Sequence, residues 1–312
     1  MRPRIAVNFA LFWETFDFGQ LRRMFPQVCD RYELVLSEAP EVVFYSVFAD
    51  GNRQDLPSGE CRYQMPVIGE RPFVRVFMTG ENAEPVMSQC DFAISFSRLV
   101  DHPNHLRLPL WVYRLRDVGL APEALVKDPN TDWEQVAAAR SSFCNFIYAH
   151  DVAFRNAVFT ELERRKSVDA VGRCMNNRDG WRVPDGIVGK VEFLKRYRFT
   201  LAVENAVWPG YATEKLVEPM LAGSVPIYIG DPQAQLEFEP ASYVDFSRFG
   251  SLREMLDYVI EVDSTRDLYL RMLSTPWLRD NRVPDYARDE TIVAFFDRIF
   301  AEALARRGRR PA

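Results

Sequence analysis

Short apolar runs separated by amphipathic, helix-like segments are the feature that most constrains how this chain can fold. In the second half, an apolar run over 143–148 is followed by a helical pattern over 155–166, and the alternation continues to a helical segment over 251–262. Short apolar runs of this kind are typical of strands buried on both faces. Strands that alternate with helices form a mainly parallel sheet covered by helices. The pattern therefore predicts an α/β fold.

The same alternation extends along most of the chain. We expect further strands over 5–9, 42–48, 74–78, 92–96, 168–171, 199–203, 225–229 and 243–245, with helices over 190–197 and 214–222. A polar stretch over 116–131 carries Pro122 and Pro129 and is typical of an interdomain connection. A length of 312 residues suits two domains. We predict two tandem Rossmann-like domains facing a cleft, over 1–125 and 126–285, and an amphipathic helix with a basic tail over 286–312.

Composition and charge exclude several classes of protein. Hydrophobic residues make up 47% of the chain and charged residues 27%, which excludes a disordered or fibrous protein. The net charge of −5 argues against a nucleic-acid partner, which would select a basic surplus. The five cysteines form no C-x-x-C pair, so we expect neither a disulfide framework nor a zinc site. Free cysteines fit a reducing compartment and predict a cytoplasmic protein.

The two ends of the chain each allow two interpretations. Arg2 and Arg4 precede an apolar run, but Asn8 interrupts it, so a buried strand is favoured over a signal peptide. From Thr291 onward, apolar residues recur at helical spacing before a tail that contains Arg306, Arg307, Arg309 and Arg310. We expect a docked helix with a solvated tail. The alternative is peripheral contact of this basic tail with the inner membrane.

Polar residues gather where the predicted strand over 199–203 ends and the next helix begins. They are Glu204, Asn205, Tyr211, Thr213, Glu214 and Lys215. A helix N-terminus has unpaired N–H groups that suit a phosphate, and Lys215 adds a full positive charge there. The Glu214 carboxylate can accept hydrogen bonds from sugar hydroxyls. The alternative is that Thr213 is only an N-cap and Lys215 is solvated.

Two other strand ends carry candidate side chains. Arg155 follows the strand over 143–148 and can clamp a phosphate with two hydrogen bonds, or it can lie on a helix surface. Glu81 and Asn82 follow Gly80 after the strand over 74–78. A carboxylate at this edge can serve as a general base, although Gly-Glu-Asn alone is also a turn sequence. Glu84 is a second carboxylate nearby.

The sequence contains no recognisable metal site or nucleotide-binding glycine motif. His102 and His105 lack further ligands that would complete a metal site, and the chain has no Asp-x-Asp, P-loop or G-x-G-x-x-G sequence. We therefore predict no metal site and expect cationic side chains and a helix N-terminus to neutralise any leaving group. Four aromatic residues could stack on sugar rings or belong to the core: Trp111, Tyr113, Trp181 and Trp208.

Several segments, in the same order, resemble the α1,3/4-fucosyltransferases, which use GDP-fucose. These segments are F-C-N-F at 143–146, R-N at 155–156, V-D-A-V-G-R-C at 168–174, K-x-E-F-L-K-R-Y-R-F-T-L-A-V-E-N at 190–205, Y-A-T-E-K-L at 211–216 and L-A-G-S-V-P-I-Y-I-G at 221–230. The family's G-E-N-x-x-P is matched at 80–85. The sequence departs from the family pattern at Val86, at Met87 and over 92–97, which concerns the acceptor more than the reaction.

The resemblance implies a GT-B fold and inverting transfer of L-fucose from GDP-fucose to a glycan, such as O3 of N-acetylglucosamine in a bacterial lipopolysaccharide O-antigen. It implies that Glu81 is the general base and that Arg155 and Lys215 contact the diphosphate. The other predicted substrate-binding residues are Asn82, Glu204, Asn205, Tyr211 and Glu214. It implies no required cofactor, with Mn²⁺ or Mg²⁺ as a stimulant. The alternatives are another GDP-sugar donor, a different acceptor, or a non-catalytic protein that binds nucleotide sugars.

Overall fold

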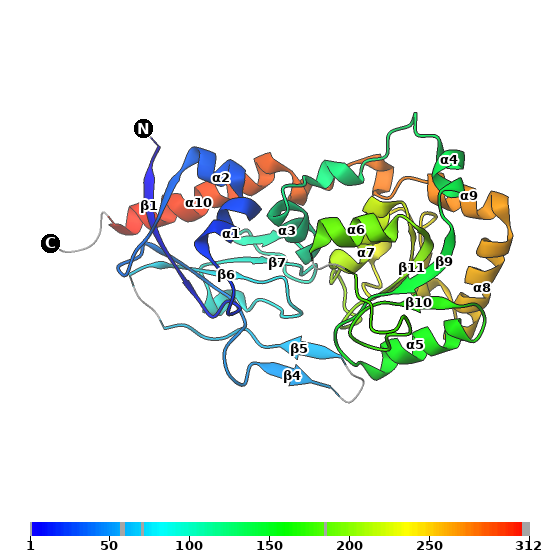
Figure 1. The fold of residues 1–312 in the computed structure, drawn as a ribbon. Coiled ribbons are helices and arrows are strands. Elements are labelled where there is room, and N and C mark those ends of the chain that lie inside the picture. The colour runs from blue at the N-terminus through cyan, green and yellow to red at the C-terminus, as the bar shows by residue number, and fades with distance from the viewer. Residues whose placement is uncertain (1, 57–59, 70–71, 184–185, 308–312) are drawn as a thin grey trace.

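The computed structural model describes residues 2–56, 60–69, 72–183 and 186–307, which form an elongated molecule of two lobes (Figure 1). The first lobe holds a six-stranded sheet in the order β2-β1-β3-β6-β7-β8, and the second holds a five-stranded sheet in the order β10-β9-β11-β12-β13. All neighbouring strands in both sheets are parallel. The predicted parallel α/β architecture is confirmed.

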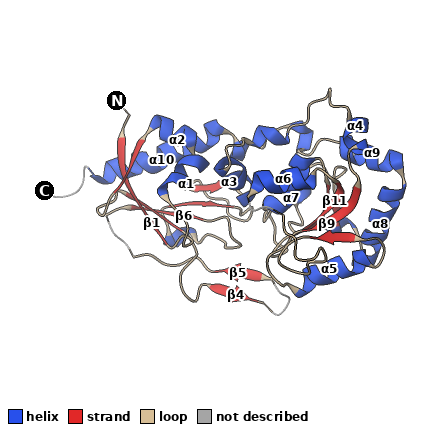
Figure 2. Cartoon of the chain, viewed as in Figure 1, coloured by secondary structure: helices blue, strands red, loops and turns tan. Residues whose placement is uncertain are grey.

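The strands are short and mostly buried. The first sheet contains β1 (Arg4–Ala10), β2 (Glu33–Leu36), β3 (Val42–Tyr45), β6 (Val74–Met78), β7 (Phe92–Ser95) and β8 (His105–Arg107). The second contains β9 (Ser142–Phe146), β10 (Val168–Ala170), β11 (Tyr197–Val203), β12 (Val225–Ile229) and β13 (Val244–Asp245). Every residue of β3, β7 and β12 is buried. In the first lobe the helices lie on one side of the sheet, and the other face packs on the segment after β5 and on loop residues (Figure 2).

Helices surround the two sheets. In the first lobe these are α1 (Phe18–Met24), α2 (Pro26–Arg31) and α3 (Leu110–Asp117). In the second they are α4 (Trp133–Ala138), α5 (Ala153–Glu163), α6 (Ile187–Leu194), α7 (Glu214–Ala222), α8 (Leu252–Ser264) and α9 (Arg266–Ser274). The helix predicted over 190–197 is wrong at its end, since Tyr197 pairs with Ser142 as the first residue of β11. The Tyr197 hydroxyl donates to Asp169, 2.7 Å away, which favours the strand over another helical turn.

The last helix, α10 (Asp289–Arg307), returns to the first lobe and packs on α2, β3 and β6 (Figure 1). The predicted apolar face is buried there: Ile292, Phe296, Ile299, Phe300 and Ala303. Docking of this helix is therefore confirmed. The basic tail is not simply solvated, since Arg306 pairs with Asp91 and Glu302, and Arg307 pairs with Glu41. Arg309 and Arg310 lie outside the described residues. Among the described helices, none has the length and apolar character needed to cross a membrane.

In both sheets the strand order reverses at a point suited to ligands. In the first sheet, successive connections move in opposite directions from β1, so that β1 and β3 flank a topological switch point, and β9 and β11 do the same in the second sheet. Ligands of such sheets bind outside the carboxyl ends of the strands at this point. A hairpin of β4 (Arg53–Asp55) and β5 (Cys61–Tyr63), which the sequence analysis did not predict, lies below the junction of the lobes in Figure 1.

The chain crosses between the lobes twice, once before α4 and once after α9. The two crossings are joined by Lys127 and Asn281: the Lys127 amide donates to the Asn281 side chain, and that side chain donates back to the Lys127 carbonyl, both at 2.9 Å. The first crossing lies in the predicted connection. The domain boundaries at 125 and 285 stay predictions. All five cysteines are free, as expected.

Candidate active site

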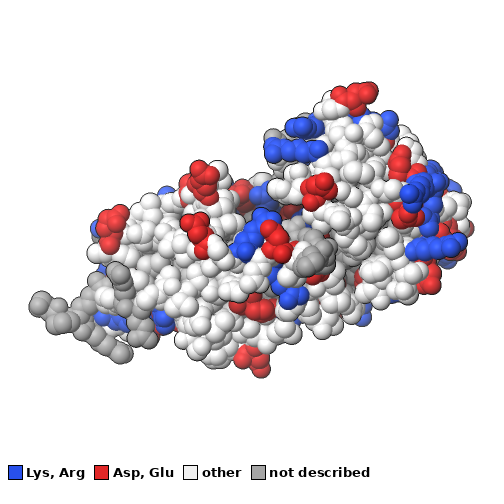
Figure 3. All heavy atoms as spheres, turned by 90° about the horizontal axis from the view of Figure 1, so that it is seen from below, with Lys and Arg blue, Asp and Glu red and all other residues white. Residues whose placement is uncertain are grey.

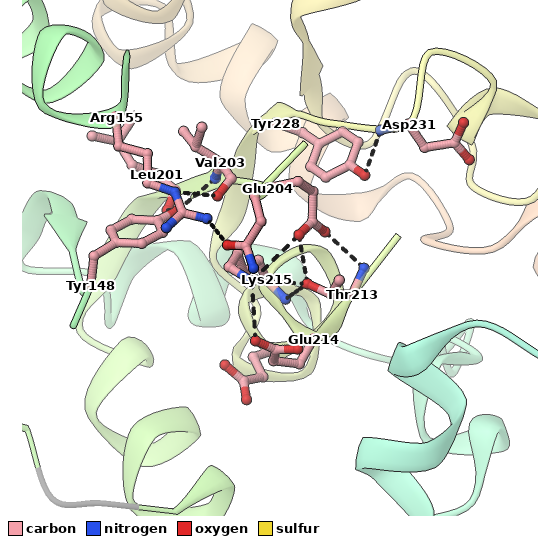
Figure 4. Close-up of polar contacts among 12 residues, drawn as sticks. Tyr148, Arg155, Leu201, Val203, Glu204, Thr213, Glu214, Lys215, Tyr228 and Asp231 are labelled. Atoms are coloured by element: carbon pink, nitrogen blue, oxygen red, sulfur yellow. Dashed lines mark hydrogen bonds and ion pairs between the residues drawn. The ribbon is translucent and has the colours of Figure 1, made fainter. Parts of the chain in front are cut away.

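Glu204 joins the end of β11 to the start of α7 (Figure 4). Its two carboxylate oxygens accept hydrogen bonds from the backbone amide and the hydroxyl of Thr213, each at 2.7 Å. The Thr213 hydroxyl in turn accepts from the Lys215 amide at 3.3 Å, so Thr213 does cap the helix. The loop between strand and helix is therefore held closed by side chains that are themselves buried.

Lys215 is held between two carboxylates and is not a solvated side chain. Its ammonium lies 3.4 Å from Glu204 and 3.3 Å from Glu214. Burial acts to lower the pKa of Lys215, but the two carboxylates outweigh it and raise the pKa. Burial acts to raise the pKa of Glu214, and the cations of Lys215 and Lys190 lower it to about 2. The start of α7 thus carries a fixed ammonium group where a helix already favours anions.

Arg155 is buried, so its interpretation as a helix-surface residue is wrong. Only 3% of the residue is exposed. Its Nε donates to the Val203 carbonyl at 3.1 Å, a second nitrogen donates to the Asn205 side chain, and its guanidinium lies 4.6 Å from the centre of the Tyr148 ring. Arg155 and Asn205 therefore meet at the switch point between β9 and β11, beside the cation of Lys215 (Figure 4).

A cavity of about 210 Å³ opens at this edge of the second sheet. Its walls come from the segments after β9, β11 and β12 and from the hairpin of the first lobe: Val152, Phe154, Val203, Glu204, Asn205, Ala206, Val207, Ile229 and Glu60. The Glu60 carboxylate accepts a hydrogen bond from the Val207 amide at 3.1 Å. The hairpin therefore contacts the loop that holds the predicted donor-binding residues.

Trp208 lies between the lobes. Its indole N–H donates to the Glu84 carboxylate at 2.7 Å, and the Arg62 guanidinium lies 4.4 Å from its ring centre. Glu84, the second carboxylate considered for the base, is thus hydrogen-bonded to the loop between β11 and α7, residues 204–213. We call this loop the donor loop, because the predicted donor-binding residues lie in and next to it. Of the other aromatic residues considered, Trp111 and Tyr113 are core residues and present no ring to a sugar, whereas Trp181 is 49% exposed.

Glu81 lies in the first lobe, at the carboxyl end of its sheet. It follows β6, and its amide donates to the Thr79 hydroxyl at 3.1 Å. Burial raises the pKa of Glu81, the Lys215 ammonium opposes that shift, and the Glu214 carboxylate adds to it. Glu81 is therefore close enough to Lys215 and Glu214 for their charges to act on its pKa, although more than 130 residues separate them in the sequence.

Asn82 and Tyr211, the remaining predicted binding residues, are buried between neighbouring loops. The Asn82 side chain donates to the Cys61 carbonyl at 3.4 Å, and its own carbonyl accepts from the Tyr63 amide at 2.9 Å. The Tyr211 ring meets Phe96 of the first lobe edge to face, with 5.2 Å between the ring centres. These contacts fix the hairpin and the donor loop in place around the cavity.

Asp231, which the sequence analysis missed, holds the loop between β11 and α7. It follows β12, and its carboxylate accepts from the Gly210 amide at 2.8 Å. Gly230 separates β12 from Asp231, and a Cβ there would lie 2.4 Å from the Tyr228 hydroxyl and 2.5 Å from the Glu204 side chain. The close approach is thus to protein groups. A carboxylate directly after a buried strand was the available signal for Asp231.

Histidine and metal chemistry find no support in the described part of the chain. His102 and His150 are exposed, and the His105 ring is hydrogen-bonded to Ser95 at 2.9 Å and to the Val100 carbonyl at 3.1 Å. No group of three or more His, Cys, Asp or Glu side chains within the described ranges could hold a metal ion. Charges of both signs are interspersed on the face that Figure 3 shows, without a continuous basic surface among the residues coloured there.

The structure thus has two facing α/β lobes. The second lobe carries cations and a helix N-terminus at the edge of its sheet, which suit a nucleotide, and the first lobe carries a carboxylate. This architecture is the GT-B glycosyltransferase fold. Solved structures agree. A crystal structure of an α1,3-fucosyltransferase matches with a TM-score of 0.75 and 25% identity over 96% of this chain and 91% of the other. A second, of an α1,3-fucosyltransferase with GDP-fucose, matches with the same TM-score at 24% identity.

The chain belongs to glycosyltransferase family 10, the fucosyltransferase family. Residues 135–298 match the family model described as glycosyltransferase family 10 (fucosyltransferase) C-term, and residues 7–114 match the alpha-(1,3)-fucosyltransferase FucT N-terminal domain. The alpha-(1,3)-fucosyltransferase FucT of Helicobacter pylori is 27% identical over 87% of this chain. The GDP-fucose protein O-fucosyltransferase 3 of Xenopus tropicalis is 32% identical over 45%. The chain spans 60% and 34% of the lengths of these two relatives.

Proposed function

We propose that this chain transfers L-fucose from GDP-fucose to a hydroxyl of a glycan, with inversion at the anomeric carbon of the fucose. Arg155 and Lys215 hold the diphosphate, and Asn205, Tyr211 and Glu214 line the nucleotide-sugar site. Glu204 and Asn82 contribute by fixing Lys215 and the β4–β5 hairpin. Family membership and the arrangement of these residues around one edge of the second sheet support this donor.

In the proposed reaction, Glu81 accepts the proton of the acceptor hydroxyl as that oxygen bonds to C1 of the fucose. The bond from C1 to the diphosphate oxygen breaks on the opposite face, and GDP leaves with the electron pair. The charge that develops on the diphosphate is neutralised by Lys215, Arg155 and the N-terminus of α7. A single displacement of this kind inverts the configuration at C1.

The observation that carries the proposal is a contact between the segment after Glu81 and the loop between β11 and α7: the Trp208 indole donates to the carboxylate of Glu84, three residues after Glu81, at 2.7 Å. Lys215 and Glu214, on the second lobe, both act on the pKa of Glu81, on the first. Burial raises this pKa, which brings the carboxylate closer to the operating pH of a general base. The proposed base, on the first lobe, and the proposed diphosphate site, on the second, therefore belong to segments that are in contact across the junction of the lobes.

The acceptor is proposed as O3 of N-acetylglucosamine, in a glycan such as a bacterial lipopolysaccharide O-antigen. The α1,3 specificity in the name of the Helicobacter relative supports this linkage. The Xenopus relative carries the name of a protein O-fucosyltransferase, and Val86 and Met87 depart from the family pattern. A different acceptor is therefore the second candidate.

Calorimetric titration with GDP-fucose, GDP-mannose and UDP-galactose tests the donor, and GDP release with a panel of lactosamine and polysaccharide acceptors tests the transfer. We expect selective binding of GDP-fucose and acceptor-dependent release of GDP. Stronger binding of GDP-mannose would favour another GDP-sugar donor. Binding without release for every acceptor would favour the non-catalytic alternative, and binding of none of the nucleotides contradicts the proposal.

Glu81→Gln tests the base. We expect kcat to fall by about 10²–10⁴, the usual contribution of general base catalysis, with the affinity for GDP unchanged. Glu84→Gln is the matched control, because Glu84 is the neighbouring carboxylate and is hydrogen-bonded to Trp208. A larger loss of kcat in Glu84→Gln than in Glu81→Gln would transfer the role of base to Glu84.

Three further expectations stay predictions. Turnover independent of metal, with stimulation by Mn²⁺ or Mg²⁺, is tested by adding each ion after treatment with a chelator. A cytoplasmic location is tested by cell fractionation. Peripheral contact with the inner membrane through the basic tail is tested by sedimentation with anionic vesicles, and in the described part of the tail Arg306 and Arg307 already pair with carboxylates.

A further inference from the structure

A group of aromatic rings lies at the carboxyl end of the first sheet, outside the site described above. Trp13 is at its centre, with ring centres 5.0 Å from Phe16, 5.8 Å from Phe12 and 6.0 Å from Phe48. Phe48 continues the group to Tyr63 of the hairpin, 5.7 Å away. We call Phe12, Trp13, Phe16, Phe48 and Tyr63 the aromatic platform.

The aromatic platform occupies the switch point of the first sheet. Phe12, Trp13 and Phe16 follow β1, and Phe48 follows β3, so they lie where sheets with this strand order bind ligands. The Phe48 amide donates to the Leu11 carbonyl at 2.9 Å, which ties the two segments together. The corresponding switch point of the second sheet holds Arg155 and Asn205 of the donor site.

The aromatic platform is joined to Glu81. The Tyr63 amide donates to the carbonyl of Asn82, directly after Glu81, at 2.9 Å. Burial raises the pKa of the Tyr63 hydroxyl to about 12, and the Glu81 carboxylate adds to that shift. The strand that carries Tyr63 is therefore joined to the segment that carries the proposed base.

The backbone before Trp13 is strained. Leu11 has a φ of +58°, a conformation that is rare for a branched side chain without a local reason. Such strain concentrates at functional sites, where surrounding structure holds it in place. Phe12 and Phe16 pack on the core of the first lobe, whereas Trp13 is only partly buried and is followed by exposed Glu14 and Thr15. The core thus supports a ring that is partly open to solvent beside polar groups.

These properties select a sugar as the ligand. A pyranose presents an apolar face of C–H groups, which packs on aromatic rings, and a rim of hydroxyls that donate hydrogen bonds to carboxylates. Partly exposed aromatic groups with a polar rim are typical of binding sites. The diphosphate would find no such environment here, because Arg155 and Lys215 lie on the other lobe.

We propose that the aromatic platform binds the acceptor: the apolar face of an acceptor pyranose packs on Trp13, and its reactive hydroxyl lies toward Glu81. This inference rests on the proposed function and adds the residues that select the acceptor. Trp13 is a substrate-contacting residue, and Phe12, Phe16 and Phe48 position its ring. In this proposal the strained loop after β1 holds Trp13 in the position where it contacts the acceptor.

The test measures acceptor binding directly, by saturation-transfer NMR of the full chain in the presence of GDP, with N-acetylglucosamine, N-acetyllactosamine and lactose as probes. We expect saturation of the C–H protons on one sugar face in the wild type. We expect Trp13→Ala to weaken binding about tenfold or more, as removal of a central aromatic anchor does, and Trp13→Phe to retain most of it. Trp133→Ala is the control, because Trp133 is a partly buried tryptophan of α4 that packs on Lys127, remote from both strand edges.

The affinity for GDP, measured by calorimetry, separates this inference from the proposed function. Weakened sugar binding with unchanged GDP affinity in Trp13→Ala, but not in Trp133→Ala, supports the aromatic platform. Equal sugar binding in Trp13→Ala and the wild type overturns it, as does failure of the wild type to bind any of the three sugars. Failure of the wild type to bind GDP-fucose contradicts the proposed function, and the sugar titration still decides on the aromatic platform.

Discussion

At the scale of single residues, the site is a set of charges whose protonation is fixed by their neighbours. Glu214 stays ionised because Lys215 and Lys190 outweigh its burial, whereas burial raises the pKa of both Glu81 and Glu204. Three carboxylates around one ammonium group therefore differ in their response to pH. Only those with a raised pKa can gain a proton in mildly acidic solution.

The rate should consequently fall on the acidic side at a higher pH than an ordinary glutamate would cause. The base must be deprotonated to act, so activity is present above the raised pKa of Glu81 and is lost as the pH falls through it. The profile of kcat/KM against pH measures this. In Glu81→Gln the acidic limb should disappear from the residual rate. Persistence of the limb in that variant would assign it to Glu204, whose pKa burial also raises.

Lys215 should contribute to donor binding through the phosphates alone. We expect Lys215→Ala to weaken GDP binding by about tenfold or more, as loss of a charged hydrogen bond of about 1.5–3 kcal/mol does, and to leave the affinity for guanosine unchanged. Calorimetry with both ligands measures the difference. Lys195→Ala is the control, because Lys195 is exposed and pairs with Glu192, three residues earlier at the end of α6. An equal loss for guanosine would indicate that the variant disturbs the fold of the site.

At the scale of elements, the loop between β11 and α7 carries most of the proposed donor site, and its backbone conformation depends on Gly210. Gly210 has a φ of +85°, and a Cβ there would lie 2.7 Å from the Phe96 carbonyl and 2.9 Å from Arg107. Atoms of the first lobe thus lie in close contact with the backbone of the donor loop. Only glycine combines this backbone conformation with this close approach.

Gly210→Ala should therefore displace the loop. We expect a lower melting temperature and weaker GDP binding, because the left-handed conformation alone costs about 1–2 kcal/mol and the clash adds to it. Thermal unfolding and calorimetry measure the two effects. Gly119→Ala is the matched control: its φ is +77° but a Cβ would meet nothing within 4 Å, so it should carry the cost of the backbone conformation without the clash and leave GDP binding unchanged. Identical GDP binding in wild type and Gly210→Ala would contradict this account of the loop.

The sequence predicted the elements well where the hydrophobic pattern is local. The strands around the donor site and the start of α7 at Glu214 follow from apolar runs and an N-cap at Thr213. The β4–β5 hairpin was missed, because its strands have three residues each, β4 is exposed, β5 is half-buried, and neither carries an apolar run. The sequence also showed no sign that the aromatic residues after β1 form a group, since only the fold brings the Phe48 ring against Trp13 and the Tyr63 ring against Phe48.

Long-range contacts also decided the roles of predicted site residues. The sequence identified Arg155 and Glu204 as polar groups at strand ends, but it could not show that Glu204 holds Thr213 and Lys215 or that Arg155 donates to Asn205. These contacts depend on which strand lies next to which. The order of strands in the sheet is a property of the folded chain and has no local signature.

At the scale of the whole molecule, a buried charge cluster joins the two lobes beside the donor loop. Glu237 of the second lobe is 2.7 Å from Arg107 and 2.9 Å from Arg98, both of the first lobe. Arg107 also donates to the Gly210 carbonyl at 3.3 Å, and Arg98 lies 3.5 Å from Asp231. The cluster therefore links the relative position of the lobes to the path of the donor loop.

Removing the charge of Glu237 should weaken the contact between the lobes and the support of the donor loop. Glu237→Gln leaves two buried guanidinium groups without this partner, and breaking a buried pair costs about 3–5 kcal/mol. We expect a lower melting temperature, a broader unfolding transition as the lobes lose their coupling, and a raised KM for GDP-fucose. Calorimetric unfolding and steady-state kinetics measure these effects. Glu239→Gln is the control: Glu239 pairs with Arg279 at 3.5 Å, Arg279 is 51% exposed, and such pairs contribute about 1 kcal/mol or less. If the two variants unfold alike and share the wild-type KM, the cluster plays no part in joining the lobes or in holding the donor loop.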